Sequence, residues 1–136
     1  MPRVCISEIR GAVCNHLMRT QAIPSITRAD VERVARRDFP AERVSEVLAL
    51  LDQYGAEAWQ REPDRVRLAA LKLAAGSFEQ LRYQVESAKR DYRDVLAPAE
   101  YPSYTQRMFR IAELPQNEQE RIIESDWKQY QDWLTR

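Results

Sequence analysis

The chain has 136 residues, of which 44% are hydrophobic and 31% are charged, with 21 basic and 21 acidic side chains. These values are typical of one globular domain with a buried core, and they exclude an intrinsically disordered chain. The balanced charge leaves no basic excess for phosphate binding, and no run approaches the roughly eighteen apolar residues of a membrane span. Neither nucleic acid nor a membrane is therefore an expected partner.

Residues 4–20 form the first predicted helix, which carries both cysteines, Cys5 and Cys14, and the single histidine, His16. Cys14 and His16 lie on different sides of a helix, so they cannot share an ion, and a second pair of ligands is missing. No metal, cofactor or catalytic residue is therefore predicted. No secretory signal is visible, so we expect free thiols and a cytoplasmic location.

Two predicted helices follow, at 28–38 and 41–54. Thr27 and Asp30 stand at the spacing of a capping box that begins the first of them. The second has the clearest amphipathic pattern in the chain. A short helical piece around Trp59 is expected after it.

The stretch RVRLAALKLAA, residues 65–75, is predicted to be the central helix. Apolar side chains cover most of its circumference, which is typical of a helix buried among its neighbours. Arg65 and Lys72 share the remaining polar stripe. Gly76 follows as a residue that adopts positive φ readily, and Ser77 is suited to cap the next helix.

The remaining predicted helices span 78–96, 104–113 and 118–134. The segment 97–102, APAEYP, is the one predicted internal boundary, between a helical core and a C-terminal helical hairpin. The whole pattern predicts a single all-α domain over residues 1–136. We expect an irregular bundle of about six helices with this hairpin at its C-terminal end.

The strings RVRLAALKLAAGS and AKRDYRDVLAPAEYP lie within residues 61–102. This stretch resembles a family of short uncharacterised bacterial proteins. The resemblance implies a small bacterial cytosolic protein and brings no activity, cofactor or substrate with it.

Aromatic residues accumulate towards the C-terminus. Tyr and Trp are the usual hot spots of protein interfaces, so they predict a surface that binds another protein or a second copy in a homodimer. The other interpretation is that they pack the hairpin onto helix 78–96. The leading hypothesis is a non-enzymatic protein-interaction module. The candidate surface consists of Tyr101, Tyr104, Trp127, Tyr130 and Trp133.

A polar cluster supports an alternative hypothesis, a small-ligand binder or enzyme that uses residues 89–104. Asp91 and Asp94 are three residues apart, so on one helix they share a face, and paired carboxylates suit acid–base chemistry. Carboxylates that alternate with arginine also form solvated ion pairs of small energy. The cluster comprises Lys89, Arg90, Asp91, Arg93 and Asp94, with Tyr101 and Tyr104 nearby.

A third hypothesis is a nucleic-acid-associated regulator, because helix 28–38 is rich in arginine and a short linker joins it to helix 41–54. In a helix-turn-helix unit, the second helix presents polar or basic residues to the major groove. The outer positions of 41–54 are mostly acidic or neutral. Nucleic acid is therefore the least expected of the three partner classes.

Overall fold

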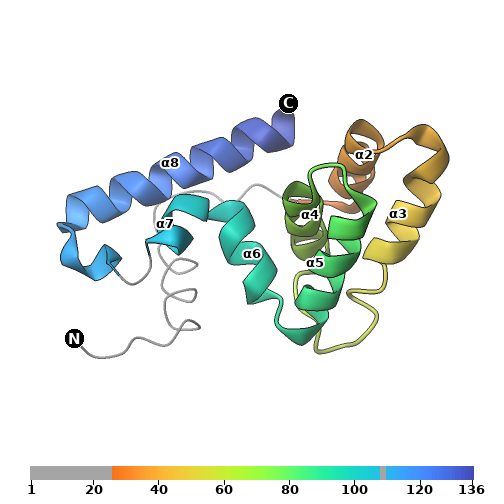
Figure 1. Cartoon of the computed structure of the whole chain (residues 1–136), viewed down its shortest axis with the longest axis horizontal. Helices are drawn as coiled ribbons and strands as arrows, with labels where there is room; N and C mark the ends of the chain where they lie inside the picture. Colours follow the sequence, from red (N-terminus) through yellow and green to blue (C-terminus); the bar gives the residue numbers. More distant parts are fainter. Residues whose placement is uncertain (1–25, 108–109) are drawn as a thin grey trace.

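The computed structural model describes residues 26–107 and 110–136, so the predicted helix 4–20 lies outside the described residues. Those residues form an irregular bundle of helices without strands, which confirms the predicted all-α fold (Figure 1). The elements are α2 (Arg28–Asp38), η1 (Ala41–Arg43), α3 (Val44–Leu51), α4 (Pro63–Ala74), α5 (Phe78–Arg90), α6 (Arg93–Glu100), α7 (Pro102–Gln106), η2 (Ile111–Glu113) and α8 (Gln116–Thr135).

The predicted central helix is α4, and it packs on α2, α5 and α6 (Figure 1). Helix α3 packs chiefly on α2 and α5, and Arg67 of α4 donates to the carbonyl oxygen of Leu51 at its end. The alanines of α4 allow its neighbours to approach closely, because a methyl group adds little to the helix radius. The buried residues of α4 are Val66, Leu68, Ala69, Ala70, Leu71 and Ala74.

Both ends of α4 have left-handed backbone. Glu62 precedes the helix with φ 48°, and Ala75 follows it with φ 50°. Gly76 comes next with φ 83°, and a Cβ there would lie 3.1 Å from the carbonyl oxygen of Asp38. Gly76 was expected to end the helix alone, but the left-handed turn already begins at Ala75. A residue with a Cβ costs about 1–2 kcal/mol in this conformation, so tertiary packing holds both ends of α4 in place.

The predicted helix 78–96 is divided in two at Asp91, so the prediction of one continuous helix is wrong. Asp91 is extended, with φ −156° and ψ 107°. Its Oδ1 accepts a hydrogen bond of 3.1 Å from the backbone N–H of Arg93, in the first turn of α6. Aspartate competes with helix in this way because its short side chain can accept a nearby backbone N–H. The chain therefore changes direction between α5 and α6.

The predicted boundary at 97–102 contains the end of α6 and the first residue of α7. Pro98 lies inside α6, where its ring removes one helical N–H donor. Glu100 and Tyr101 are buried nevertheless, so this segment is part of the core. The division of the chain into domains stays a prediction.

Helices α7 and α8 pack against each other and form the predicted C-terminal hairpin. The buried carboxylate of Asp126 on α8 accepts hydrogen bonds from the backbone N–H groups of Ser103 and Tyr104, at 3.2 and 2.8 Å. Negative charge is favourable at the first turn of a helix, so this contact fixes α7 on α8. In Figure 1, α8 extends along α6 and α7, and its C-terminal end approaches α2 and α4.

Some helix limits also differ from the predicted ones. Helix 28–38 is confirmed, and Thr27 donates its backbone N–H to Asp30 Oδ2 at 2.9 Å, as expected of the capping box. The segment 41–54 begins with a 3-10 turn, and no helix forms around Trp59. The segment 104–113 contains the end of α7 and the separate turn η2. None of the described helices is both long and apolar enough to cross a lipid bilayer.

Truncating the centre of α4 tests its role. Leu71 has no exposed surface, so Leu71→Ala removes buried apolar area and leaves a cavity. We expect the free energy of unfolding to fall by about 2–5 kcal/mol in urea titrations followed by circular dichroism. Tyr83→Ala is the control, because this side chain on α5 is 60% exposed and its loss should stay within about 0.5 kcal/mol. Equal effects would mean that α4 is not the centre of the core.

Candidate functional site

The aromatic residues predicted as an interaction surface lie mostly inside the chain. Tyr101, Tyr104, Trp127 and Tyr130 are buried, and Trp133 is half-buried. The Trp127 ring stacks on Tyr101 and on Tyr130, with centroids 6.4 and 5.6 Å apart. This stack packs α8 on the segment between α6 and α7. In a single chain these rings form core, and only Trp133 is open to solvent.

The predicted polar cluster lies around the break between α5 and α6. Because the helix ends at Asp91, Asp91 and Asp94 do not share one helical face, and that part of the prediction is wrong. Arg93 donates from Nε and Nη2 to Asp91, at 3.0 and 3.3 Å, which raises the pKa of the Arg93 guanidinium. Arg90 and Asp94 are exposed. The geometry is that of a surface turn that joins two helices.

A buried ion pair joins α4 to α6. Arg65 Nη2 and Nε donate to the two carboxylate oxygens of Glu100 at 2.6 and 2.7 Å, and Nη1 also contacts Glu62 at 3.2 Å. The Glu100 side chain is 1% exposed and that of Arg65 is 10% exposed. Burial raises the pKa of Glu100, and the Arg65 guanidinium opposes that change. The Arg65 side chain of the predicted polar stripe is therefore largely buried against α6.

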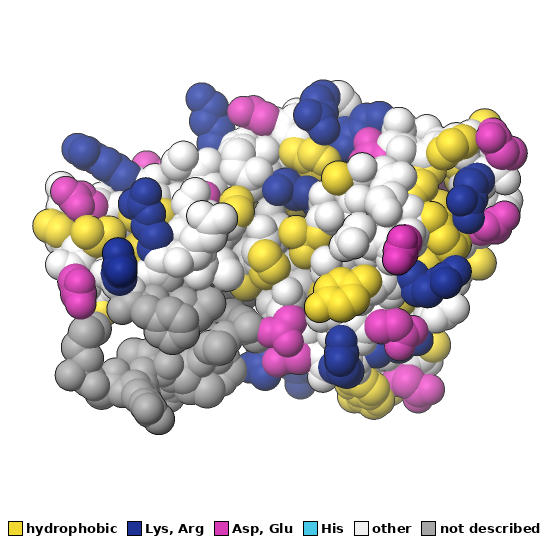
Figure 2. All heavy atoms as spheres, viewed as in Figure 1, with side chains coloured by type: hydrophobic (Ala, Val, Ile, Leu, Met, Phe, Trp, Pro, Cys, Tyr) yellow, Lys and Arg dark blue, Asp and Glu magenta, His cyan; other side chains and the backbone are white. Residues whose placement is uncertain are grey.

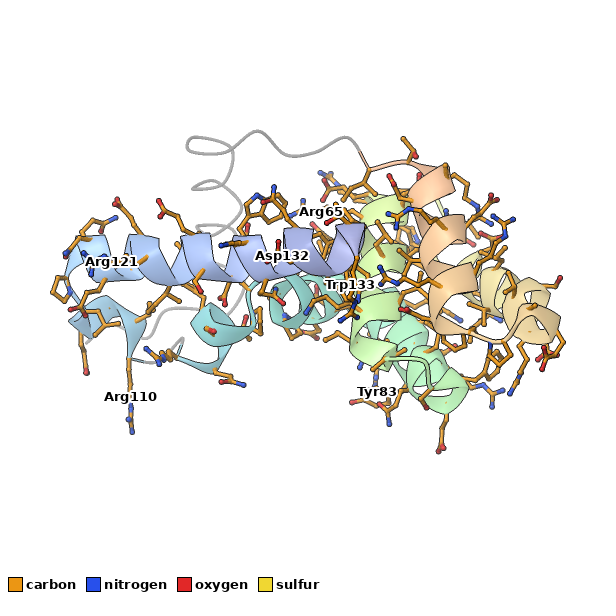
Figure 3. The ribbon with its side chains drawn as sticks, turned by 90° about the horizontal axis from the view of Figure 1, so that it is seen from above. Arg65, Tyr83, Arg110, Arg121, Asp132 and Trp133 are labelled. Carbon is orange, nitrogen blue, oxygen red and sulfur yellow. The ribbon has the colours of Figure 1, made fainter. Side chains whose placement is uncertain are left out.

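A cavity of about 700 Å³ lies where α8 meets the ends of α2 and α4. Figure 3 shows Asp132 and Trp133 at this junction, on the part of α8 nearest the bundle. Three cations and two carboxylates contribute to its walls. The lining residues are Arg37, Asp38, Lys72, Ala75, Gly76, Gln129, Asp132, Trp133 and Arg136.

Arg37, at the cavity wall, joins α2 to the C-terminal end of α8. Its Nε donates to Asp38 at 2.9 Å, and its Nη1 donates to the carbonyl oxygens of Trp133 and Arg136, at 2.8 and 3.2 Å. The guanidinium also lies over the Trp133 ring, 5.1 Å from its centroid. A cation is favourable at a helix C-terminus, where carbonyl groups lack helical donors. Arg37 therefore fixes the end of α8 on α2.

Lys72 differs from Arg37, because no residue in the described parts of the chain accepts a hydrogen bond from it or lies within ion-pair distance. The side chain is half-buried, and this burial lowers the pKa of its amine. The field of Asp126 opposes the change, but the carboxylate of Asp126 already accepts two backbone N–H groups of α7. Lys72 is thus a cation at a cavity wall without an ion-pair partner among residues 26–107 and 110–136.

The loop between α3 and α4 is ordered by its own side chains. The Gln60 side chain accepts the backbone N–H groups of Gly55 and Glu57, at 2.8 and 3.1 Å, and Tyr54 Oη donates to the Arg61 carbonyl at 2.8 Å. Trp59 nevertheless points outwards and is 63% exposed. A large apolar side chain on an ordered loop that stays in water is a candidate contact for a partner.

Metal chemistry gains no support from the described residues, since they contain no group of three or more potential ligands that could hold an ion. Cys5, Cys14 and His16 lie outside the described residues, so the structure says nothing of their arrangement.

Sequence reasoning identified neither the cavity nor the exposed loop. Arg37 and Trp133 are 96 residues apart, so their contact depends on the path of the whole chain. One signal was present, since Lys72 is among the few lysines of a chain whose basic residues are mostly arginine. Lys72 lines the cavity, whereas Arg65, which shares its polar stripe, faces Glu100.

Comparison with known proteins gives no match: no protein-family model, curated protein or solved structure matches the chain. The resemblance of residues 61–102 to a bacterial family therefore stays a prediction.

Removing one partner of the buried ion pair should destabilise the protein strongly. Arg65→Met leaves the Glu100 carboxylate buried without its counter-ion, so we expect a loss of about 3–5 kcal/mol in the free energy of unfolding near neutral pH. Without Arg65, burial raises the pKa of Glu100 further above its unfolded value. The folded variant then binds a proton more readily than the unfolded chain, so the loss should shrink from about pH 8 towards about pH 4.

Two further variants make this result specific. Arg65→Met combined with Glu100→Met removes both charges and should recover most of the stability. Arg36→Met breaks an exposed contact of 4.0 Å to Glu32 and should cost less than about 1 kcal/mol. A loss for Arg65→Met no larger than this control, or one independent of pH, would contradict a structural role for the pair.

Proposed function

We propose that this protein is a non-enzymatic protein-interaction module and that the Trp59 loop is its contact surface. The observation that carries the proposal is the exposure of Trp59 on a loop held in one conformation by hydrogen bonds. Ala56 and Ala58 are exposed beside it, with the exposed Glu57 between them, so the loop tip combines apolar side chains with one carboxylate. A rigid aromatic side chain loses little conformational entropy on binding, which is why tryptophan is frequent among hot spots.

The loop is also firmly attached to the core. Arg67 on α4 donates from Nη2 to the carbonyl oxygen of Tyr54 at 2.7 Å, and from Nε to that of Leu51 at 3.2 Å. Gly55 lies against this guanidinium, where a Cβ would come within 2.6 Å of Nη2. Such support keeps the loop in position before a partner arrives, which reduces the ordering cost of binding.

The aromatic residues that the sequence predicted as the contact surface are not part of the surface proposed now, because they pack the hairpin onto the bundle. The partner in this proposal is another protein or a second copy of the chain, and the proposed location is the bacterial cytoplasm. Tyr83 on α5 is the other large apolar side chain that is mostly exposed among the described residues. Figure 3 shows it pointing away from the bundle, so it is available for a partner as well.

The two alternative hypotheses have weaker support. The polar cluster at 89–104 lies on a surface turn, and Asp91 is engaged by Arg93. For nucleic-acid binding, Arg33 and Arg36 lie within 3.6 and 4.0 Å of carboxylates on the same helix, and Arg37 pairs with Asp38. Figure 2 shows basic and acidic side chains interspersed over the face in view. Interspersed charges of both signs give little attraction for phosphate.

Photo-crosslinking tests the proposed surface. A photoreactive phenylalanine analogue at position 59 should give one dominant covalent adduct in the native cell, with either another protein or a second copy. The matched control places the analogue at Ser125, which is exposed on α8. Light scattering of the purified chain separates the two kinds of partner. No adduct from position 59 above the level at position 125 would overturn the proposal.

Once the partner is captured, Trp59→Ala measures its contribution. We expect binding to weaken by at least about 2 kcal/mol, roughly thirtyfold in Kd, because an exposed anchor of this size dominates a typical interface. The same change should alter the free energy of unfolding by less than about 0.5 kcal/mol, because most of the side chain is already in water. Unchanged affinity would exclude Trp59 from the contact.

A further inference from the structure

We infer that the cavity between α2, α4 and α8 binds a small organic anion, whose carboxylate or phosphate group pairs with Lys72. This inference concerns a different surface from the Trp59 loop and does not depend on it. The volume of this cavity, about 700 Å³, falls within the range of about 300–1,000 Å³ that small-molecule sites occupy.

The first argument is that the cations lining the cavity outnumber the carboxylates. Three cations face the cavity against two carboxylates, and one of those carboxylates, Asp38, is already engaged by Arg37. Asp132 also lines the cavity and is exposed. Arg136 lines the wall and contributes its backbone carbonyl to Arg37, while no described residue pairs with its side chain. Lys72 and Arg136 therefore remain as cations available to one ligand.

The second argument is the desolvation of the Lys72 ammonium group. A half-buried ammonium group loses part of its hydration, and no acceptor of the described chain replaces the lost water. Arg37 lines the same cavity and uses Nε and Nη1 on Asp38 and the end of α8, while its buried Nη2 has no hydrogen-bond partner among the described residues. Lys72 lies in the last turn of α4, where the helix C-terminus favours a cation, and an anion in the cavity would add the direct acceptor that the described chain does not supply.

The third argument is the shape of the remaining wall. Trp133 is half-buried between Arg37 and Tyr130, with its centroid 5.6 Å from that of Tyr130. The Arg37 guanidinium covers part of this ring, so the ring offers its remaining exposed part beside the cations. Trp133 and Ala75 are the apolar side chains of the lining, so a ligand that joins an anionic group to a small organic body finds apolar as well as charged contacts there.

Lys72 can be distinguished chemically from Lys89 and Lys128, the other lysines of the chain. Lys89 contacts Glu86 at 2.7 Å and Gln53 at 3.1 Å, and Lys128 is exposed. Pyridoxal 5′-phosphate is a suitable probe, because it has an aldehyde and a phosphate. The neutral amine attacks the aldehyde carbon, water leaves, and a C=N bond forms, which borohydride then reduces to a stable amine. Peptide mass spectrometry reports each lysine separately.

The labelling is measured on the full chain in four conditions: the probe alone, with inorganic phosphate, with benzoate, and with sodium chloride at matched ionic strength. We expect Lys72 to react faster than Lys89 and Lys128. An anion at about ten times its dissociation constant should slow the labelling of Lys72 about tenfold, while the other lysines change less than about twofold. Protection by benzoate alone, by phosphate alone or by both assigns the anionic group.

A second measurement follows binding through the tryptophan fluorescence of the chain, to which Trp133 contributes together with Trp59 and Trp127. Titration with the protecting anion should change the emission of the wild-type chain and of Lys89→Gln, and the change should be absent in Lys72→Gln. Arg136→Gln should raise Kd severalfold. Equal reactivity of Lys72 and Lys128, no protection by either anion, or equal protection of all lysines would overturn the inference, and the labelling of the wild type decides it even if a variant fails to fold.

Discussion

The pair formed by Arg65 and Glu100 is the constraint on which the arrangement of the other helices depends. A carboxylate as completely buried as Glu100 is tolerable only with a hydrogen-bonded cation against it, and Arg65 supplies two parallel bonds. Because the partners lie on the first turn of α4 and the last residue of α6, the pair sets the angle between those helices. The hairpin of α7 and α8 begins directly after Glu100, so its position follows from the same contact.

The hairpin is then fixed at two further points. Asp126 holds the first turn of α7 on α8, and Arg37 holds the last turn of α8 on α2. The stacked rings between these points fill the interior, which explains why aromatic residues gather in this part of the sequence without forming an exposed surface. The two surfaces proposed for binding differ in shape. The Trp59 loop is an exposed loop, and the cavity is a hollow where α2, α4 and α8 end. A rigid frame can support both, because neither requires the core to rearrange.

Local sequence signals predicted most of the helices, since they depend on neighbouring residues. The cap at Thr27 and Asp30 and the apolar circumference of α4 are examples, and both are confirmed. The break at Asp91 was missed because hydrophobic spacing continues across it, so the aspartate that accepts a backbone N–H was the only signal. The cavity and the burial of the aromatic residues depend on contacts between distant segments. Helical periodicity gives the face on which Trp127 lies, but not whether another helix covers that face.

The left-handed residues at both ends of α4 have a consequence for how this chain tolerates change in length. Packing holds Glu62 and Ala75 in a conformation that ordinary residues avoid, so the helix can neither extend at one end nor shorten at the other to absorb an extra residue. An insertion within α4 would rotate every later side chain by about 100°, and Arg65 or Leu71 would then leave its partner. Natural relatives of this protein should therefore vary in length in the connections and keep the spacing between these two turns constant.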